Sequence, residues 1–166
     1  MHPATLRPAT EDDVETILEL IHELARYERE PDVVTATAED LRRDGFGERP
    51  RFHVLLAEWR GRVAGFAFYF FNYSTWQGRA GLYLEDLFVR PEHRGRGLGK
   101  ALLVALAREA VARGCGRFQW QVLDWNKPAI DFYEQLGARP LAEWINMRVS
   151  GDALAALAAT PTAVDR

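Results

Sequence analysis

The chain has 166 residues, of which 48% are hydrophobic and 27% are charged, a balance typical of a soluble globular protein and not of a disordered one. Its single cysteine, Cys115, excludes an intrachain disulfide and a multi-cysteine metal site. The longest apolar run, residues 63–71, is too short to span a bilayer, and the first residues lack the apolar core of a secretion signal. The net charge of -3 argues against a nucleic-acid-binding protein and favours a cationic small ligand. We therefore expect a cytoplasmic protein without a membrane or nucleic-acid partner.

The N-terminal part of the chain predicts a short strand followed by two helices. The strand covers about residues 5–7, and Thr10 then has the features of a helix N-cap, with acidic residues in the first turn. Apolar residues at helical spacing extend this helix to about Tyr27. Thr37 begins a second, short helix, which ends at Gly45.

Three strands are predicted next, over residues 52–59, 63–71 and 81–89. The first two flank Arg60-Gly61-Arg62, which is typical of a hairpin turn. A stripe of phenylalanines at alternating positions, with one extra aromatic residue, predicts sheet core in the second strand, although it could also face a partner subunit. These are Phe66, Phe68, Phe70 and Phe71.

The C-terminal half continues the alternation of helix and strand. A helix is predicted over residues 98–113, a strand over 117–123 and a helix over 128–136. One or two final strands are expected within residues 139–149, and a short tail helix over 152–159.

Strands before helices, together with a strand-helix-strand unit, predict an α/β sandwich with a mixed sheet. No repeat or linker divides the chain. We therefore expect one domain over residues 1–150, followed by a short helical or loose tail over residues 151–166.

The loop Arg94-Gly95-Arg96-Gly97-Leu98-Gly99-Lys100 joins a predicted buried strand to an amphipathic helix. Its alternating glycines let the main chain turn tightly and approach a ligand closely. The main-chain amides then point to the positive end of the helix, where three basic side chains add charge. The loop therefore predicts a diphosphate site. The alternative is a glycine-rich surface loop whose arginines are only solvated.

Two familiar phosphate-binding motifs do not fit this loop. A P-loop requires glycine at the position of Arg94 and serine or threonine at that of Ala101. A dinucleotide fingerprint requires glycine where this chain has Lys100.

Residues 89–99 resemble the acetyl-CoA signature of the GNAT superfamily of N-acetyltransferases, whose pattern Arg/Gln-x-x-Gly-x-Gly/Ala is filled by Arg94, Gly97 and Gly99. Downstream, Asn126 and the aromatic pair Phe132-Tyr133 are similar to the second GNAT block, and Gly137-Ala138 follows them. The two blocks together are more specific than either alone.

The resemblance extends to the diamine (spermidine/spermine) acetyltransferases and their thialysine-acetylating relatives, over about residues 5–148. The matching stretches are residues 23–28, 44–47, 73–78, 82–86, 122–126 and 132–133. The chain departs from the family at residues 141–144, where an acidic stretch is shorter, and at Arg90 and Arg96, which make the binding loop more basic. These departures concern the amine and not the cofactor.

The resemblance implies a GNAT-like, mostly antiparallel twisted sheet flanked by helices, with a β-bulge near Glu85 that exposes main-chain amides. It also implies acetyl-CoA as cosubstrate, no metal and a homodimer. The implied coenzyme-binding residues are Leu87, Phe88, Val89, Arg94, Gly95, Arg96, Gly97, Leu98, Gly99, Lys100, Asn126, Pro128 and Tyr133.

Acetyl transfer to an amine requires a group that takes a proton from the amine and a group that protonates the departing thiolate. Glu85 and Asp86 interrupt an apolar strand, and we assign Glu85 as ammonium anchor and base, acting through water. The alternative for both carboxylates is pairing with a structural arginine. The resemblance makes Tyr133 the general acid, and its alternative is a core tyrosine.

By resemblance, the amine pocket also includes Tyr27, Glu28, Asp124 and Trp125, with Glu85 and Asp86. Trp76 and Trp125 could form cation–π contacts with an ammonium, or could serve packing alone. Asn126 could bind the pantetheine arm, cap the helix that follows, or do both.

These residues predict an acetyl-CoA-dependent N-acetyltransferase acting on a small primary amine, a polyamine or a lysine-like amino acid. Direct attack within a ternary complex is expected, because no positioned cysteine or serine nucleophile is evident. The alternatives are a non-catalytic acyl-CoA-sensing module and an acetyltransferase acting on protein amines.

Overall fold

The computed structural model describes residues 3–162. The expectations that concern residues 1–2 and 163–166, at the two ends of the chain, lie outside the described residues. The chain divides into two compact units, Met1–Leu123 and Asp124–Arg166, which are described in turn.

The first unit is built on one five-stranded sheet in the order β1-β2-β3-β4-β5. The strands are β1 Ala4–Pro8, β2 His53–Trp59, β3 Arg62–Ser74, β4 Arg79–Val89 and β5 Phe118–Trp120. Strands β1 to β4 pair antiparallel and β5 pairs parallel to β4, which confirms the predicted mixed, mostly antiparallel sheet. Strand β5 is shorter than the predicted strand over residues 117–123.

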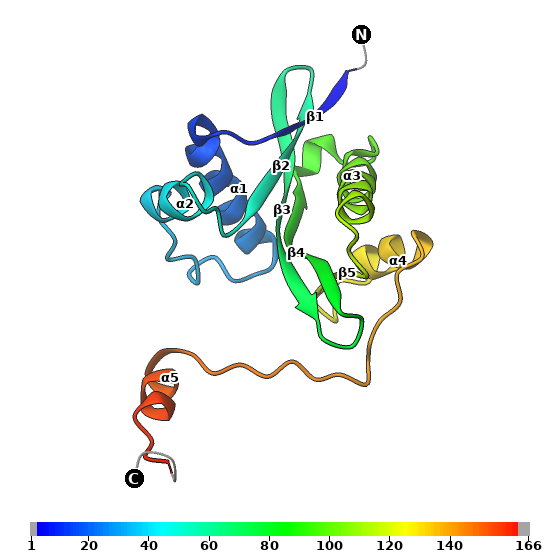
Figure 1. Ribbon diagram of the computed structural model, residues 1–166. Helices are drawn as coiled ribbons and strands as arrows, with labels where there is room; N and C mark the ends of the chain where they lie inside the picture. The colour runs from blue at the N-terminus through cyan, green and yellow to red at the C-terminus, as the bar shows by residue number, and fades with distance from the viewer. Residues whose placement is uncertain (1–2, 163–166) are drawn as a thin grey trace. The chain divides into compact units, whose positions relative to one another are not determined.

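Helices cover both faces of this sheet (Figure 1). Helices α1 and α2 lie on one face and α3 lies on the other. The helices of the first unit are α1 Val14–Tyr27, α2 Ala38–Gly45 and α3 Leu98–Ala112, with 3₁₀ turns η1 Glu11–Asp13 and η2 Pro91–His93. The helices predicted from apolar spacing are thereby confirmed to within a few residues.

The core under α1 holds much of the phenylalanine stripe of β3. Phe66 is fully buried there beside Ile17 and Leu20 of α1. Phe68 packs against the same cluster, and its ring stacks on Phe52 at 4.2 Å between centroids. Phe66 and Phe68 are therefore core residues, as the alternation predicts, and are not available to a partner subunit.

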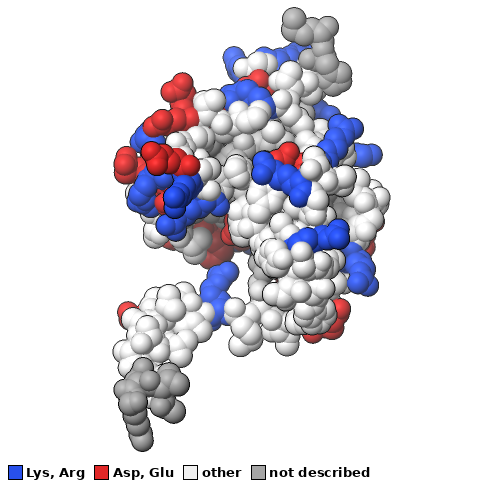
Figure 2. All heavy atoms as spheres, in the orientation of Figure 1, with Lys and Arg blue, Asp and Glu red and all other residues white. Residues whose placement is uncertain are grey.

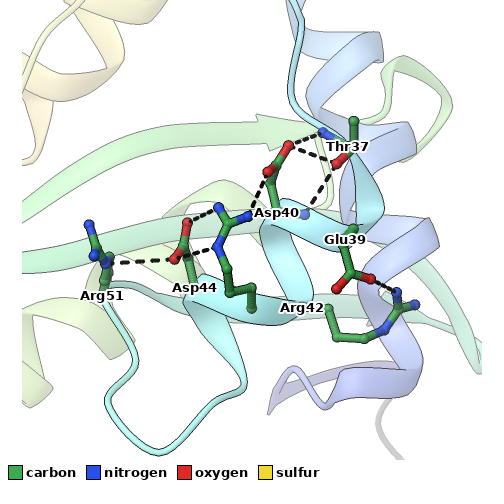
Figure 3. A network of polar contacts seen from close by, with 7 residues as sticks. Thr37, Glu39, Asp40, Arg42, Asp44 and Arg51 are labelled. Carbon is green, nitrogen blue, oxygen red and sulfur yellow. Dashed lines mark hydrogen bonds and ion pairs between the residues drawn. The ribbon is translucent and has the colours of Figure 1, made fainter.

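Local sequence signals set the turn and helix boundaries correctly. Arg60 and Gly61 have φ angles of 51° and 76°, so they form the two-residue, left-handed turn that joins β2 to β3. At the start of α2, Asp40 N–H donates to the Thr37 hydroxyl at 3.2 Å, and the Asp40 carboxylate accepts from Thr37 N–H at 3.0 Å (Figure 3). This reciprocal capping box confirms Thr37 as the N-cap.

Ion pairs cover the outer surface of α2. Arg43 pairs with Asp40 at 3.0 Å and with Asp44 at 2.8 Å, and Arg42 lies 3.4 Å from Glu11. Figure 2 shows acidic and basic side chains interspersed over α1 and α2. This surface therefore presents no single sign of charge to a ligand.

The second unit contains α4 Lys127–Gln135 and α5 Gly151–Ala158. The prediction of one or two strands within residues 139–149 is wrong, since no residue of this segment belongs to a strand. Its apolar side chains are exposed, including Ile145 at 83% and Met147 at 88%. A β-branched, apolar segment becomes a strand only where a neighbouring strand accepts its hydrogen bonds, and no described strand pairs with this one.

Candidate active site

The centre of the candidate site is a β-bulge in β4 at Glu85. In the β3–β4 ladder, Phe68 lies opposite Asp86 while Tyr69 lies opposite Leu84, so Glu85 has no residue across from it. An unpaired extra residue bends its strand and redirects the side chains beside it. The bulge expected from the family resemblance is therefore confirmed.

The bulge also coincides with an open edge of the sheet. Strand β5 pairs with β4 only from Leu82 to Leu84, so pairing on that side stops where the bulge begins. From Glu85 to Val89, β4 has no strand partner on this edge among the described residues. Leu87, Phe88 and Val89, which the resemblance implies bind the coenzyme, lie on this open edge.

Asp86 is the perturbed carboxyl of the site. Burial, with added repulsion from the charges of Glu85 and Glu28, raises the pKa of Asp86 to about 7. Glu85 itself is exposed. Within residues 3–162 neither carboxylate pairs with a lysine or arginine, against the alternative in which a structural arginine neutralises them. The partly buried carboxyl of Asp86 is therefore available to a cationic ligand.

The end of α1 meets this bulge. Tyr27 is the last residue of α1, and its ring centroid lies 6.4 Å from that of Phe88. Glu28 follows, and burial raises the pKa of its carboxyl as well. The charge of Glu28 also acts on Asp86, where it adds to the rise in the pKa of that carboxyl. Tyr27, Glu28, Glu85 and Asp86 thus all lie in the first unit, in which the end of α1 contacts β4 through Tyr27 and Phe88, and their role in an amine pocket remains a prediction.

The glycine-rich loop has the geometry that an anion requires. Gly95 and Gly97 have φ angles of 73° and 79°, which other residues rarely adopt, and Gly97 is the N-cap of α3. In the described part of the chain, none of the main-chain N–H groups of residues 95–100 donates a hydrogen bond to the protein. Six consecutive free donors at a helix N-terminus fit a diphosphate.

The basic residues around the loop differ in what they do. Lys100 is exposed at the start of α3. The guanidinium of Arg94 lies 4.7 Å from the ring of Tyr27, and that of Arg96 lies 4.6 Å from the ring of Trp59. Both remain beside the loop, where a diphosphate would meet their positive charge.

Arg90 does not add positive charge to the binding loop, which the sequence analysis expected it to do. Its guanidinium forms ion pairs with Glu23 at 2.8 Å and Glu19 at 3.1 Å, and it donates to Val63 O at 3.0 Å. It therefore ties α1 to β3 and does not make the coenzyme loop more basic.

The remaining predicted site residues lie in the second unit. Asn126 is the N-cap of α4 and accepts a hydrogen bond from Ala129 N–H at 3.4 Å, so its capping role is confirmed. Pro128 lies in the first turn of this helix, and half-buried Tyr133 lies near its end. Asp124 and Trp125 immediately precede this N-cap, and both are exposed. The coenzyme and substrate roles of these residues remain predictions.

Sequence reasoning missed two features of this site. It assigned the base to Glu85 and gave Asp86 only a place in the amine pocket, although burial strongly raises the pKa of Asp86. It also missed the contact of Arg94 with Tyr27, because the two residues are far apart in the chain. The acidic pair in an apolar strand was the only sequence signal for the first feature, and nothing local signalled the second.

The described part of the chain contains neither a metal-binding cluster nor a membrane-spanning helix. No group of three or more histidine, cysteine, aspartate or glutamate residues within residues 3–162 is arranged to hold a metal ion. None of the described helices combines the length and hydropathy needed to cross a membrane.

Comparison with known proteins agrees with this geometry. The model of the acetyltransferase (GNAT) family matches residues 14–138. The chain is 44% identical to a thialysine N-epsilon-acetyltransferase of Sus scrofa, over 95% of this chain and 99% of that protein. It is 50% identical to L-ornithine N5-acetyltransferase NATA1 of Arabidopsis thaliana, over 57% of this chain and 42% of that protein.

A solved structure shares the fold over almost the whole chain. The integron cassette protein from the mobile metagenome of V. cholerae superposes with a TM-score of 0.81 at 27% identity, covering 96% of this chain and 100% of that one. The bulged strand, the open sheet edge and the glycine-rich loop thus all lie within residues 14–138, the part of the chain that the family model matches. The protein belongs to the GNAT acetyltransferase family and is an N-acetyltransferase that uses acetyl-CoA.

Proposed function

We propose that this enzyme acetylates a primary amine of a small molecule, either the side-chain amine of a lysine-like or ornithine-like amino acid or a polyamine. The observation that carries the proposal is the group of three carboxyls near the bulge, those of Glu28, Glu85 and Asp86. Among the described residues, neither Glu85 nor Asp86 pairs with an arginine or a lysine. Such a group favours a cationic ligand. The relatives named for the N-epsilon of thialysine and the N5 of L-ornithine agree with this class.

The carboxyls at the bulge would bind the amine and take its proton. An alkylammonium has a pKa near about 10 in water and is not a nucleophile until it loses a proton. Asp86, whose pKa is raised to about 7, is suited to accept a proton near neutral pH. Exposed Glu85 would anchor the incoming ammonium and act through water, and Tyr27 and Glu28 would line the same pocket.

Acetyl-CoA would supply the acetyl group as a thioester. The free amides of residues 95–100, with Arg94, Arg96 and Lys100, would hold its diphosphate. The open edge of β4 from Leu87 to Val89, with Asn126 and Pro128, would hold the pantetheine arm. Tyr133 would donate its phenolic proton to the departing thiolate, so the reaction needs no acyl-enzyme.

A kinetic screen of amines tests this proposal. The protein is incubated with acetyl-CoA and spermidine, putrescine, thialysine, lysine or ornithine, and free thiol is followed over time. We expect turnover with at least one of these amines, and the ratio of kcat/KM values identifies the acceptor. Tight coenzyme binding without turnover on any amine would instead support an acyl-CoA sensor. Turnover on a peptide amine alone would support a protein acetyltransferase.

We also propose that the enzyme is a cytoplasmic homodimer. Its lone cysteine is free, which suits a reducing compartment. Phe70 and Phe71 of the aromatic stripe are only half-buried and leave apolar surface for a partner. Light scattering coupled to size-exclusion chromatography measures the mass, and fractionation of cells that express the protein measures its location.

A further inference from the structure

Arg94 joins the coenzyme loop to the amine side of the site. Its Nε donates a hydrogen bond to Val89 O at 2.8 Å, which ties it to the end of β4. Its guanidinium carbon lies 4.7 Å from the ring centroid of Tyr27 and 5.6 Å from that of Phe88. The guanidinium therefore covers two rings that are themselves neighbours, one at the end of α1 and one beyond the bulge.

The outer edge of the same guanidinium is available to an anion. Arg94 is exposed, and of its side-chain nitrogens only Nε donates a hydrogen bond to the described residues. A guanidinium is planar, so it stacks through its face while it donates through its edge. Because Gly95 and the following free amides lie directly beside it, a diphosphate in the loop would meet the Nη groups of Arg94.

We infer that Arg94 is a positioning residue that couples coenzyme binding to the order of the amine site, by holding Tyr27 and the adjacent Glu28. A diphosphate bound at its edge fixes the guanidinium plane, and the fixed plane restrains the ring of Tyr27 at the end of α1. The amine would then meet a pocket that the coenzyme has already ordered. The amine half of this inference rests on the proposed function, whereas the ordering of Tyr27 by the coenzyme does not.

Arg96 provides a matched control in the same loop. Its guanidinium also stacks on an aromatic ring, that of Trp59 at 4.6 Å, and its Nη2 also donates to a main-chain oxygen, that of Glu92 at 3.3 Å. Trp59, however, is the last residue of β2 and is not one of the residues proposed to bind the amine. Arg94→Lys and Arg96→Lys each keep the charge and lose one stacked guanidinium, and only the first loses the link to Tyr27.

The first measurement follows amide hydrogen exchange with free CoA as the only ligand. The amides of Glu28, Arg29 and Glu30 donate to main-chain oxygens at the end of α1, so they report its opening. We expect saturating CoA to slow exchange of residues 24–30 about threefold to tenfold in the wild type and in Arg96→Lys, and not in Arg94→Lys. If Arg94→Lys binds CoA too weakly for saturation, Tyr27→Leu provides the test. This variant keeps Arg94 for the diphosphate and should lose the same protection.

The second measurement is the dissociation constant of the preferred amine with and without saturating CoA, by calorimetry. We expect CoA to tighten amine binding about fivefold or more in the wild type and in Arg96→Lys, and less than twofold in Arg94→Lys. Equal protection and equal coupling in the two arginine variants, or no effect of CoA in the wild type, would overturn the inference. CoA-dependent protection of residues 24–30 without binding of any amine would keep the link between Arg94 and Tyr27 and reject the proposed substrate class.

Discussion

Asp86 lies directly opposite Phe68 across the β3–β4 ladder, although its neighbour Glu85 faces no residue at all. The ring of Phe68 packs against the core under α1, so this pairing places the carboxyl of Asp86 on the same face of the sheet as the end of α1. The bulge thus turns two adjacent acidic residues into one exposed carboxylate and one that is held away from water.

Substituting Asp86 tests its burial through the free energy of unfolding. The pKa of Asp86 is raised from 3.8 to about 7, so the protonated carboxyl favours the folded state at low pH. This stability is complete below about pH 4 and is lost as the pH rises through about 7, for a total of about 4 kcal/mol at most. We expect Asp86→Asn to become more stable relative to the wild type between pH 4.5 and 8, measured by urea unfolding. Asp32→Asn, at an exposed loop position, should show no such trend.

The pH dependence of kcat/KM distinguishes Glu85 from Asp86 as the base. If Asp86 accepts the proton, activity should rise with pH through about 7, where its carboxyl ionises. Glu85→Gln removes a charge that raises this pKa and should shift the rise to lower pH. Asp86→Asn should abolish the rise and lower kcat/KM about 10²-fold to 10⁴-fold. A rise that stays in place in Glu85→Gln would show that the Glu85 charge does not act on the base.

Removing the hydroxyl of Tyr133 tests its assignment as general acid. Tyr133→Phe should lower kcat about 10²-fold or more, because the departing thiolate loses its proton donor. The affinity for acetyl-CoA, measured by calorimetry, should stay within about threefold, since one neutral hydrogen bond contributes little net free energy. Tyr69→Phe, in β3, is the control for loss of a hydroxyl alone. Equal losses of kcat and affinity in Tyr133→Phe would make Tyr133 a binding or packing residue.

Alanine substitutions at two glycines with similar φ angles distinguish the cost of backbone strain from the loss of coenzyme binding. Gly61 and Gly97 have φ angles of 76° and 79°, and an added Cβ would meet no atom within 4 Å at either position. Alanine at either site should therefore cost a similar amount of stability, about 1 kcal/mol, measured by thermal unfolding. Only Gly97→Ala should weaken CoA binding, about tenfold or more, because it distorts the amides that would face the diphosphate. Unchanged CoA affinity in Gly97→Ala would place the diphosphate elsewhere.

Much of the fold followed from short-range patterns in the chain. Apolar spacing located α1 and α3, Thr37 marked the start of α2, and Arg60-Gly61 marked the hairpin. The segment 139–149 was the failure among these predictions. Its apolar residues indicated strands, but a strand also depends on a partner that lies elsewhere in the fold.

The sequence by itself determined the family, the glycine-rich loop and the residue types of the candidate site, because helix caps, left-handed glycines and each of the two GNAT blocks are short motifs that can be recognised within a few residues of the chain. Only the tertiary structure decided that burial raises the pKa of Asp86, that Arg90 pairs with Glu19 and Glu23 of α1, and that Arg94 covers Tyr27. Burial and stacking depend on which distant segments meet, and one unpaired residue in a sheet register, Glu85, redirects the side chains that follow it.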